Sequence, residues 1–318
     1  MAHNRVQHVA INPSKRGRVS HHPLMAFVAD IRMIANCWLR PGNTSSAHHV
    51  EAFLANTRQR LGGKKIALLR ADSGFSDAAF LDHLDHEQLH HIIALHLTQP
   101  LQRALVNEQG WWTLPDEHGK VVEGIELIRF MYQAQVWTKP RWVIGIGQHI
   151  AQRDQPKGKA LNLFADDPAI GQWRYSALVT DLDLPAAVVW RTYRGRADCE
   201  NRIKELKYDF AADSFNMRDF WATEAALNTV VLAYNLMSFF KQALLKNSVV
   251  KHSSNAIQHQ LQTLRYKLFA KAGYLTTASR KPILNMVVAM QQRAWMQGLW
   301  DATKTFDLPA EFKPSYSP

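Results

Sequence analysis

The sequence has few cysteines, no long apolar run and, over much of its last third, no acidic residues. Its two cysteines, Cys37 and Cys199, exclude a disulfide scaffold and, in the absence of a signal peptide, predict a cytoplasmic location. The longest apolar run, Ala225 to Phe240, contains two asparagines and is shorter than the roughly 20 residues that span a bilayer. We therefore expect a buried helix there and no membrane partner.

Acidic residues are absent before Asp30 and between Glu224 and Asp301, in a chain of 318 residues with a net charge of +11. The basic residues of these two stretches are Arg5, Lys15, Arg16 and Arg18, and Lys241, Lys246, Lys251, Arg265, Lys267, Lys271, Arg280, Lys281 and Arg293. Neutralising phosphates releases counterions, so both stretches predict a nucleic-acid partner. An ordinary solvated basic surface is the alternative explanation.

Apolar periodicity predicts an alternation of strands and helices. We expect strands at Leu24 to Ala29, Met33 to Arg40, Ile66 to Leu69, His91 to Leu97, Gly124 to Tyr132, Trp142 to Gly147 and Tyr175 to Thr180. We expect helices from a cap at 44–46 to about Leu61, from Asp77 to Asp85, and from Pro185 onward. Asp72 follows one of these strands, at the edge where open α/β sheets usually place their chemistry.

The stretch HEQLHHIIALH matches the H-E-x-x-H pattern of zinc proteases. His86 and His90 would lie one helical turn apart, with Glu87 as the base and His96 as a third ligand. The extended pattern needs glycine where this chain has Ile93, and a β-branched residue resists a positive φ. We therefore prefer the interpretation that these histidines lie at the end of a helix and along a strand. A zinc peptidase is the minor alternative.

A second pattern consists of Tyr193, Arg196, Glu200 and Lys207. On one continuous helix these residues fall within a stripe of about 60°. An ordinary salt-bridged helix surface would also explain them, since an Arg–Glu pair four residues apart contributes only a few tenths of a kcal/mol.

With this Y-R-E-K spacing the sequence resembles a group of bacterial insertion-sequence DDE transposases of the retroviral integrase superfamily. Four segments resemble their counterparts in that family, in the same order: NPSKRGRVSHHPL, LRPGN, LRADSGF and YRGRADCENRIKELKYDF. The resemblance covers nearly the whole chain. It implies an α/β fold with an RNase H-like mixed sheet flanked by helices, a mainly β insertion and a helical carboxyl-terminal region.

The resemblance also implies a division of the chain into four parts. Residues 1–98 and 173–212 are expected to form the catalytic core, separated by a β-rich insertion at 99–172, and 213–318 the helical region. The family's first catalytic aspartate lies on a strand before the NPSKRGR segment, which no acidic residue precedes here. The expectation is an amino-terminally truncated chain of uncertain activity, with Asp30 as the nearest substitute.

The family's chemistry implies roles for individual residues. Asp72 and Glu200 match the second and third catalytic carboxylates, which would hold two divalent cations, Mg²⁺ or Mn²⁺. The implied DNA contacts are Tyr193, Arg196, Lys207 and Arg70, of which Arg70 could equally pair with Asp72. Trp137, Trp142 and Trp173 are candidates for stacking on a displaced base, although core packing explains most of them.

Together these features imply a transposase that binds double-stranded DNA at transposon ends and at the target, as a homodimer on paired ends. It would catalyse metal-dependent cleavage and strand transfer, and would associate with the nucleoid when bound to DNA. The alternative from another class is a non-catalytic DNA-binding relic or regulator of a full-length enzyme. Binding to DNA ends that does not require a metal would distinguish this relic or regulator from an active transposase.

Overall fold

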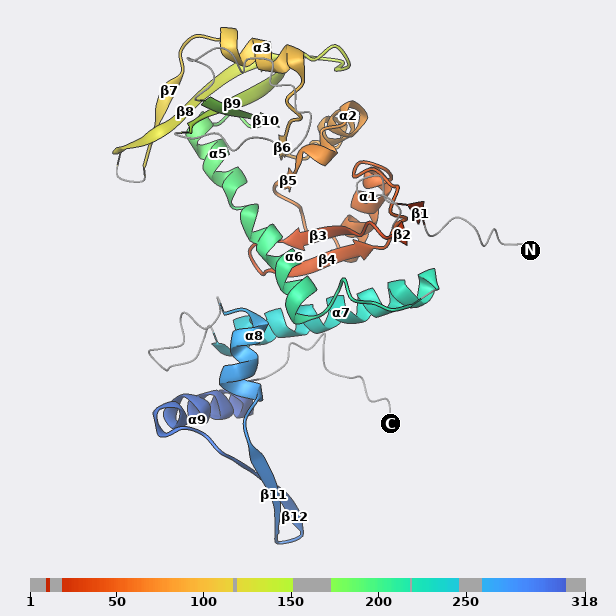
Figure 1. The fold of residues 1–318 in the computed structure, drawn as a ribbon, viewed down its shortest axis with the longest axis vertical. Helices are drawn as coiled ribbons and strands as arrows, with labels where there is room; N and C mark the ends of the chain where they lie inside the picture. Colours follow the sequence, from red (N-terminus) through yellow and green to blue (C-terminus); the bar gives the residue numbers. More distant parts are fainter. Residues whose placement is uncertain are drawn as a thin grey trace, which may run out of the picture. The chain divides into compact units, whose positions relative to one another are not determined.

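The computed structural model describes residues 10–11, 19–116, 119–150, 173–217, 219–245 and 259–306 (Figure 1). Six of the basic residues in the two stretches predicted to bind nucleic acid lie outside these ranges: Arg5, Lys15, Arg16, Arg18, Lys246 and Lys251. The chain forms two compact units. Unit 1 comprises Met1–Leu24 and Arg40–Asp198, and unit 2 comprises Met25–Leu39 and Cys199–Pro318.

Unit 1 is built on a six-stranded mixed sheet with the order β5-β6-β10-β9-β8-β7. The strands are β5 (Leu69–Ala71), β6 (His91–Ala94), β7 (Trp112–Pro115), β8 (Val121–Tyr132), β9 (Arg141–His149) and β10 (Trp173–Thr180). Strands β5 and β6 are parallel, and the other neighbours are antiparallel. Strands from the segment predicted as an insertion, 99–172, are thus hydrogen-bonded into the same sheet as β6 and β10. The four-part division stays a prediction.

Helices cover both faces of this sheet (Figure 1). Alternate residues of a strand point to opposite faces, so Ile93 and Val143 contribute to one apolar cluster while Ile92 and Ile144 contribute to the other. The helices are α1 (Val50–Arg60), α2 (Ala78–His86) and α3 (Gln99–Asn107) on the first face, and α5 (Ala186–Arg194) on the second. The predicted α/β class, a mixed sheet flanked by helices, is confirmed.

Helix α1 begins later than the sequence predicts. The predicted cap at 44–46 lies in turns, and the helix starts at Val50 after His49, whose φ is 58°. The guanidinium of buried Arg40 donates to three carbonyl oxygens of the preceding segment, including that of His48 at 2.8 Å. These bonds stabilise the turns in place of a first helical turn, so the predicted cap is wrong.

Unit 2 has a mainly helical carboxyl-terminal region, as predicted, together with two two-stranded sheets. Its elements are β3 (Leu24–Val28), β4 (Met33–Trp38), α6 (Ala197–Asp209), α7 (Phe220–Phe240), η2 (Lys241–Leu245), α8 (Leu261–Leu264), η4 (Arg265–Phe269), β11 (Gly273–Ala278), β12 (Lys281–Met286) and α9 (Met290–Thr305). The β3-β4 pair confirms two predicted strands. The β11-β12 hairpin was not predicted, because neither of its faces is buried and no apolar alternation marks it.

Helix α7 packs against β4 through an amide as well as apolar side chains. Asn235 accepts from the Ile34 amide at 2.8 Å and donates to the Ile34 carbonyl at 2.9 Å, as a neighbouring strand would. The expected burial of this helix is only partly right, since Trp221, Leu232 and Leu236 are exposed. Among the described residues, no helix combines the length and apolarity needed to cross a membrane.

Candidate functional site

Asp72 lies directly after β5 and caps a short 3₁₀ helix, η1 (Ser73–Phe75). Its Oδ1 accepts from the Gly74 amide at 3.0 Å, and its Oδ2 accepts from the Arg196 guanidinium at 2.9 Å. A Cβ on residue 74 would approach the Ser46 hydroxyl to 2.6 Å, so glycine is needed for this close packing. The carboxylate is therefore held on both oxygens while its side chain is 46% exposed.

Arg70, one strand position before Ala71, has a different partner. Its Nη1 donates to the Thr192 carbonyl at 2.6 Å, in the last turn of α5, where a cation is favourable to the helix dipole. A Cβ on Gly195 would lie 2.6 Å from the same nitrogen. The sequence left two roles open for Arg70, a phosphate contact or an ion pair with Asp72. In the structure it is Arg196 that pairs with Asp72.

The residues of the Y-R-E-K pattern do not share one helix: Tyr193 lies on α5, Arg196 lies in the turn that follows, and Glu200 and Lys207 lie on α6. Helix α5 ends at Arg194 and α6 begins at Ala197, with i→i−3 hydrogen bonds at the junction such as Arg196 N to Tyr193 O at 2.8 Å. The single continuous helix assumed for the stripe is therefore wrong. Glycine at position 195 weakens helix propensity there and leaves the room that Arg70 requires.

The two units divide the predicted site residues. Asp72, Arg70, Tyr193 and Arg196 belong to unit 1, and Glu200 and Lys207 belong to unit 2. Both Glu200 and Lys207 are exposed on α6, seven residues apart.

Tyr193 lines an open groove of about 510 Å³ beside η1 in unit 1. Trp190 and Arg194 line the same groove, and the Arg194 guanidinium lies 4.8 Å from the Trp190 ring centre. Gln148 and Ser176 provide polar groups from the sheet. Trp190 was not predicted as a site residue, although its position three residues before Tyr193 places both on one helix face.

The donor chemistry of Asp72 fits a divalent cation, because a half-exposed carboxylate is a hard oxygen ligand. Glu200 is a second carboxylate of the same kind. In the part of the chain that the structure describes, no group of three or more histidine, cysteine or acidic side chains is positioned to hold a metal. Asp72 in unit 1 and Glu200 in unit 2 are each a candidate ligand by donor chemistry alone.

The zinc-protease pattern does not form its helix. Helix α2 ends at His86, and Gln88, with φ of 51°, closes it in a Schellman motif through the bond from Leu89 N to Leu84 O at 2.9 Å. His90 therefore lies beyond the helix. Glu87, the supposed base, pairs with Arg58 at 2.5 Å, and this hydrogen bond lowers the Glu87 pKa.

The three tryptophans predicted as candidates for base stacking pack against neighbouring side chains, and Asp30 lies on the surface. Trp137 is buried in the first apolar cluster, Trp142 stacks under Arg129 at 3.9 Å, and Trp173 contacts His149 edge-on. Packing of Trp137 is thus confirmed. Asp30 lies in the exposed turn after β3.

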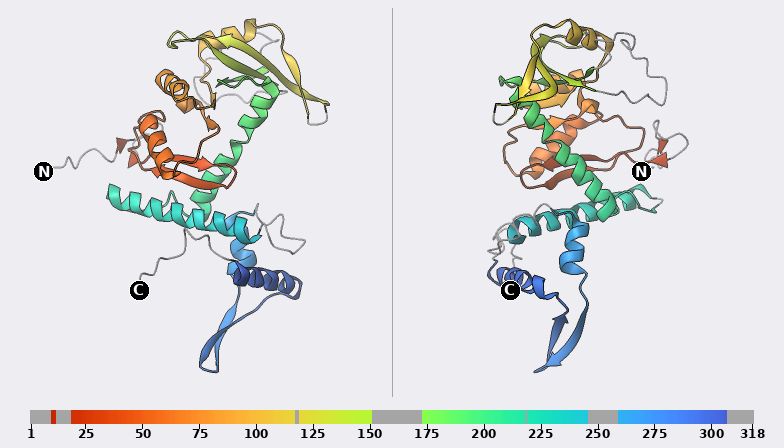
Figure 2. Two further views of the ribbon diagram at one scale, coloured as in Figure 1. Left: turned by 180° about the vertical axis from the view of Figure 1, so that it is seen from behind. Right: turned by 60° about the vertical axis from the view of Figure 1, so that its left-hand side comes forward.

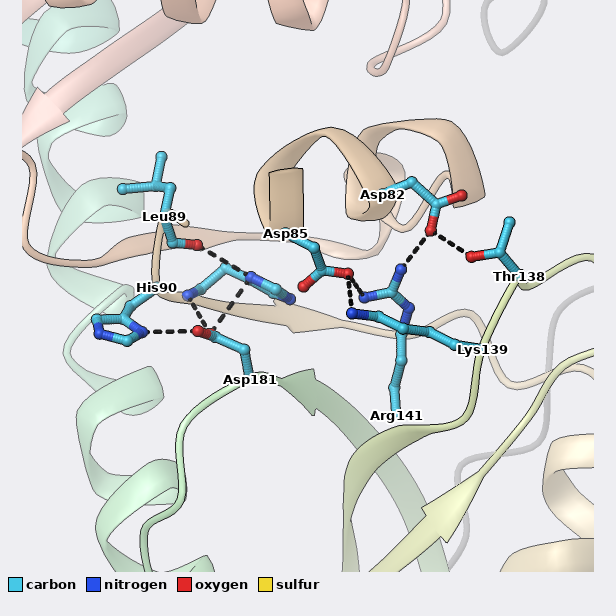
Figure 3. A network of polar contacts seen from close by, with 9 residues as sticks. Asp82, Asp85, Leu89, His90, Thr138, Lys139, Arg141 and Asp181 are labelled. Atoms are coloured by element: carbon cyan, nitrogen blue, oxygen red, sulfur yellow. Dashed lines mark hydrogen bonds and ion pairs between the residues drawn. The ribbon is translucent and has the colours of Figure 1, made fainter. Parts of the chain in front are cut away.

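Two groups of polar contacts that the sequence did not reveal link α2 to β9, and the start of β6 to the end of β10 (Figure 3). Buried Arg141 donates to Asp82 at 2.6 Å and also to Asp85, whose carboxylate is 3.1 Å from the Lys139 ammonium. Figure 3 shows Asp82 and Asp85 around the end of the Arg141 side chain, and Asp181 beside His90. The contacts of Arg141 fix α2 on the sheet.

His91 is buried within this region, and burial lowers its pKa. Its Nδ1 lies 3.2 Å from the Leu89 carbonyl and 3.3 Å from Asp181 Oδ1, both acceptors, so Nδ1 carries the proton. The His91 amide donates to the same Asp181 oxygen at 2.7 Å, and His90 pairs with the other at 2.6 Å.

Comparison with known proteins gives three findings. A solved structure, the piggyBac transposase synaptic complex with hairpin DNA, is similar to 93% of this chain at 10% identity and a TM-score of 0.43. The chain spans 55% of that chain's length. No curated protein matches the sequence. The family model described as Transposase DDE domain group 1 matches residues 2–304, and the chain belongs to this family.

Proposed function

We propose that this protein is a DNA transposase of a bacterial insertion sequence, which binds the element's ends and catalyses metal-dependent cleavage and strand transfer. The observation that carries the proposal is the Asp72 carboxylate at the carboxyl end of β5, held by the Gly74 amide and the Arg196 guanidinium. Membership of the DDE transposase family supports it.

In this proposal Asp72 and Glu200 are the ligands of Mg²⁺ or Mn²⁺. Such cations activate the attacking hydroxyl and stabilise the leaving oxygen in phosphodiester transfer. Asp72 is suited to the task because two hydrogen bonds fix its carboxylate while about half of the side chain remains accessible. A fixed carboxylate loses little conformational entropy when it binds a cation.

The neighbouring cations are proposed to contact the DNA backbone. Arg196 lies beside Asp72 and would bind the phosphate next to the scissile bond, and Lys207 would contact a phosphate further along the strand. Tyr193, which lines the groove beside η1, would contact the sugar-phosphate backbone. Arg70 is proposed to act indirectly, because its bond to Thr192 holds the end of α5 that carries Tyr193.

The test is cleavage of a supercoiled plasmid that carries the genomic segment surrounding the reading frame, with the purified full chain and Mg²⁺ or Mn²⁺. Asp72→Asn and Glu200→Gln should each abolish metal-dependent nicking, by at least about a hundredfold, because each removes a charged metal ligand.

Asp77→Asn is the matched control. Asp77 also caps a helix, accepting from the Ala79 amide at 3.0 Å, and asparagine caps helices equally well. Full nicking by the control with none by Asp72→Asn supports the proposal. Equal nicking by wild type and both site variants would overturn it.

A second candidate function is a non-catalytic DNA-binding regulator of a transposase. It is favoured by one observation, that the described residues bring no three potential metal ligands together. This function predicts end-specific binding that is unchanged by EDTA and by Glu200→Gln. The proposed homodimer on paired ends and its association with the nucleoid apply to both functions.

A further inference from the structure

The β11-β12 hairpin projects from the segment between η4 and α9 and has both faces open (Figure 2). All six residues of β11 and five of the six residues of β12 are exposed. The hairpin is closed at its base by the bond from Val287 N to Ala272 O at 2.8 Å. At about 3.3 Å per residue, its arms are about 20 Å long.

The turn at the hairpin's tip has an unusual residue choice. Ser279 and Arg280 have φ values of 53° and 64°, the conformation of a two-residue type I′ turn, between the paired residues Ala278 and Lys281. Such turns favour asparagine and glycine, which adopt positive φ readily. Arginine at the second position costs conformational free energy, and a strained residue of this kind points to a use for its side chain.

The charge of the hairpin is uncompensated. Arg280 and Lys281 are exposed at the tip, and no carboxylate within the described residues forms an ion pair with either. The sequence itself has no acidic residue from Glu224 to Asp301, which includes the whole hairpin. Lys271 and Arg293 add positive charge at the base.

The two faces of the hairpin differ in chemistry. One face carries Ala278 and Ile283 and, beside them, the polar side chains of Tyr274, Thr276 and Asn285, of which the Asn285 amide donates to the Thr276 hydroxyl at 2.9 Å. These groups match the hydrogen-bonding edges of bases. The other face carries the cross-strand pair Leu275 and Leu284.

We infer that the β11-β12 hairpin is a DNA-binding arm, which enters the major groove of a duplex with its polar face toward the bases and with Arg280 and Lys281 on phosphates. The major groove, about 12 Å wide, admits a two-stranded ribbon. The inference rests on the proposed function for its partner, DNA, but assigns an element that the active-site proposal does not use.

The test measures binding of the full chain to a fluorescent duplex of mixed sequence over a series of NaCl concentrations. Arg280→Gly and Lys281→Gln should each weaken binding and reduce the slope of log K against log salt by about 0.9 for each phosphate that the variant no longer neutralises. Arg280→Gly suits the turn, so its melting temperature should be equal to or higher than that of wild type. Lys304→Gln is the control, because Lys304 is already paired with Asp301 at 3.2 Å.

Hairpin variants that keep the affinity and slope of the control, while wild type binds the duplex, would overturn this inference and leave the proposed function intact. Failure of wild type to bind any duplex would overturn both. Self-association is the competing use of the hairpin. If Leu275→Thr with Leu284→Thr halves the sedimentation mass while Arg280→Gly binds DNA as wild type does, the arm is a dimer contact instead.

Discussion

Unit 1 buries a cation between two carboxylates, whereas unit 2 buries a carboxylate between two cations. In unit 1, Arg141 donates to Asp82 and Asp85. In unit 2, the Glu205 side chain, 1% exposed, accepts from Arg202 and from Lys241 at 2.9 Å each. It also accepts from the Leu261 amide at 3.0 Å, and so joins α6 to η2 and α8.

The difference follows the charge of each region. The Arg141 cluster includes Lys139 and is balanced, with two cations and two carboxylates. The Glu205 cluster places two cations around one carboxylate, in the unit whose sequence lacks acids from Glu224 to Asp301. We conclude that the charged cluster serves folding in both units, although the charge at its centre is a cation in unit 1 and a carboxylate in unit 2.

The largest effect is expected for Glu205→Gln. Removing the carboxylate takes the ion-pair partner from buried Lys241 and one ion pair from Arg202, which lowers the free energy of unfolding by about 3 to 5 kcal/mol. Hydrogen exchange should accelerate in α6 and α7 and remain unchanged in β8 and β9. Asp301→Asn, which removes an exposed carboxylate, is the control and should leave exchange as in wild type. Unchanged exchange in α6 for Glu205→Gln would contradict the comparison.

A smaller effect is expected for Arg141→Met, about 1 to 3 kcal/mol by urea unfolding. Both acids keep another partner, since Lys139 lies 3.1 Å from Asp85 and Thr138 donates to Asp82 at 2.8 Å. Arg58→Met removes a guanidinium from an exposed pair and should not move the urea midpoint. A loss for Arg141→Met as large as that for Glu205→Gln would show that the two clusters are equivalent.

The smallest effect concerns His91, next to the unit 1 network. Burial lowers its pKa below 6.5, so the unfolded chain binds this proton more readily than the folded one. Stability should be complete above about pH 6.5 and fall as pH decreases toward the folded-state pKa, by at most about 1.4 kcal/mol per pH unit. Asp181 and Asp85 oppose the shift, and Arg141 adds to it.

Urea midpoints between about pH 5 and pH 7.5 would test this, with His91→Gln as the non-titrating variant. The variant should flatten the curve in part, because burial lowers the pKa of His21 and His259 as well. A wild-type curve identical to that of His91→Gln would refute the assignment.

Much of unit 1 could be predicted because its strands are buried on both faces. Continuous apolar runs such as 92–95 are most stable at the centre of a covered sheet. The sequence also predicted that α2 ends before His90, because the apolar run after His90 indicates a strand. The start of α1 could not be predicted, since Arg40, distant in sequence from the helix, replaces a local cap.

The candidate site was predicted in its residues but not in its geometry. Asp72 after a strand and the spacing of the Y-R-E-K residues are visible in the sequence, and they carried the resemblance to DDE transposases. The partner of Asp72 and the break at Gly195 are not, because both depend on where β5 and α5 pack.

The sequence by itself determined the α/β class, the family and the uneven charge, because apolar period, motif spacing and composition are local properties. Only the tertiary structure decided that Arg196 pairs with Asp72, that the strands of 99–172 join the main sheet, and that 273–286 forms an open hairpin. The first two depend on contacts between distant segments, whose free energy exceeds the local preferences of the residues involved. The hairpin is local, but its turn residues Ser279 and Arg280 do not favour the positive φ that the turn requires.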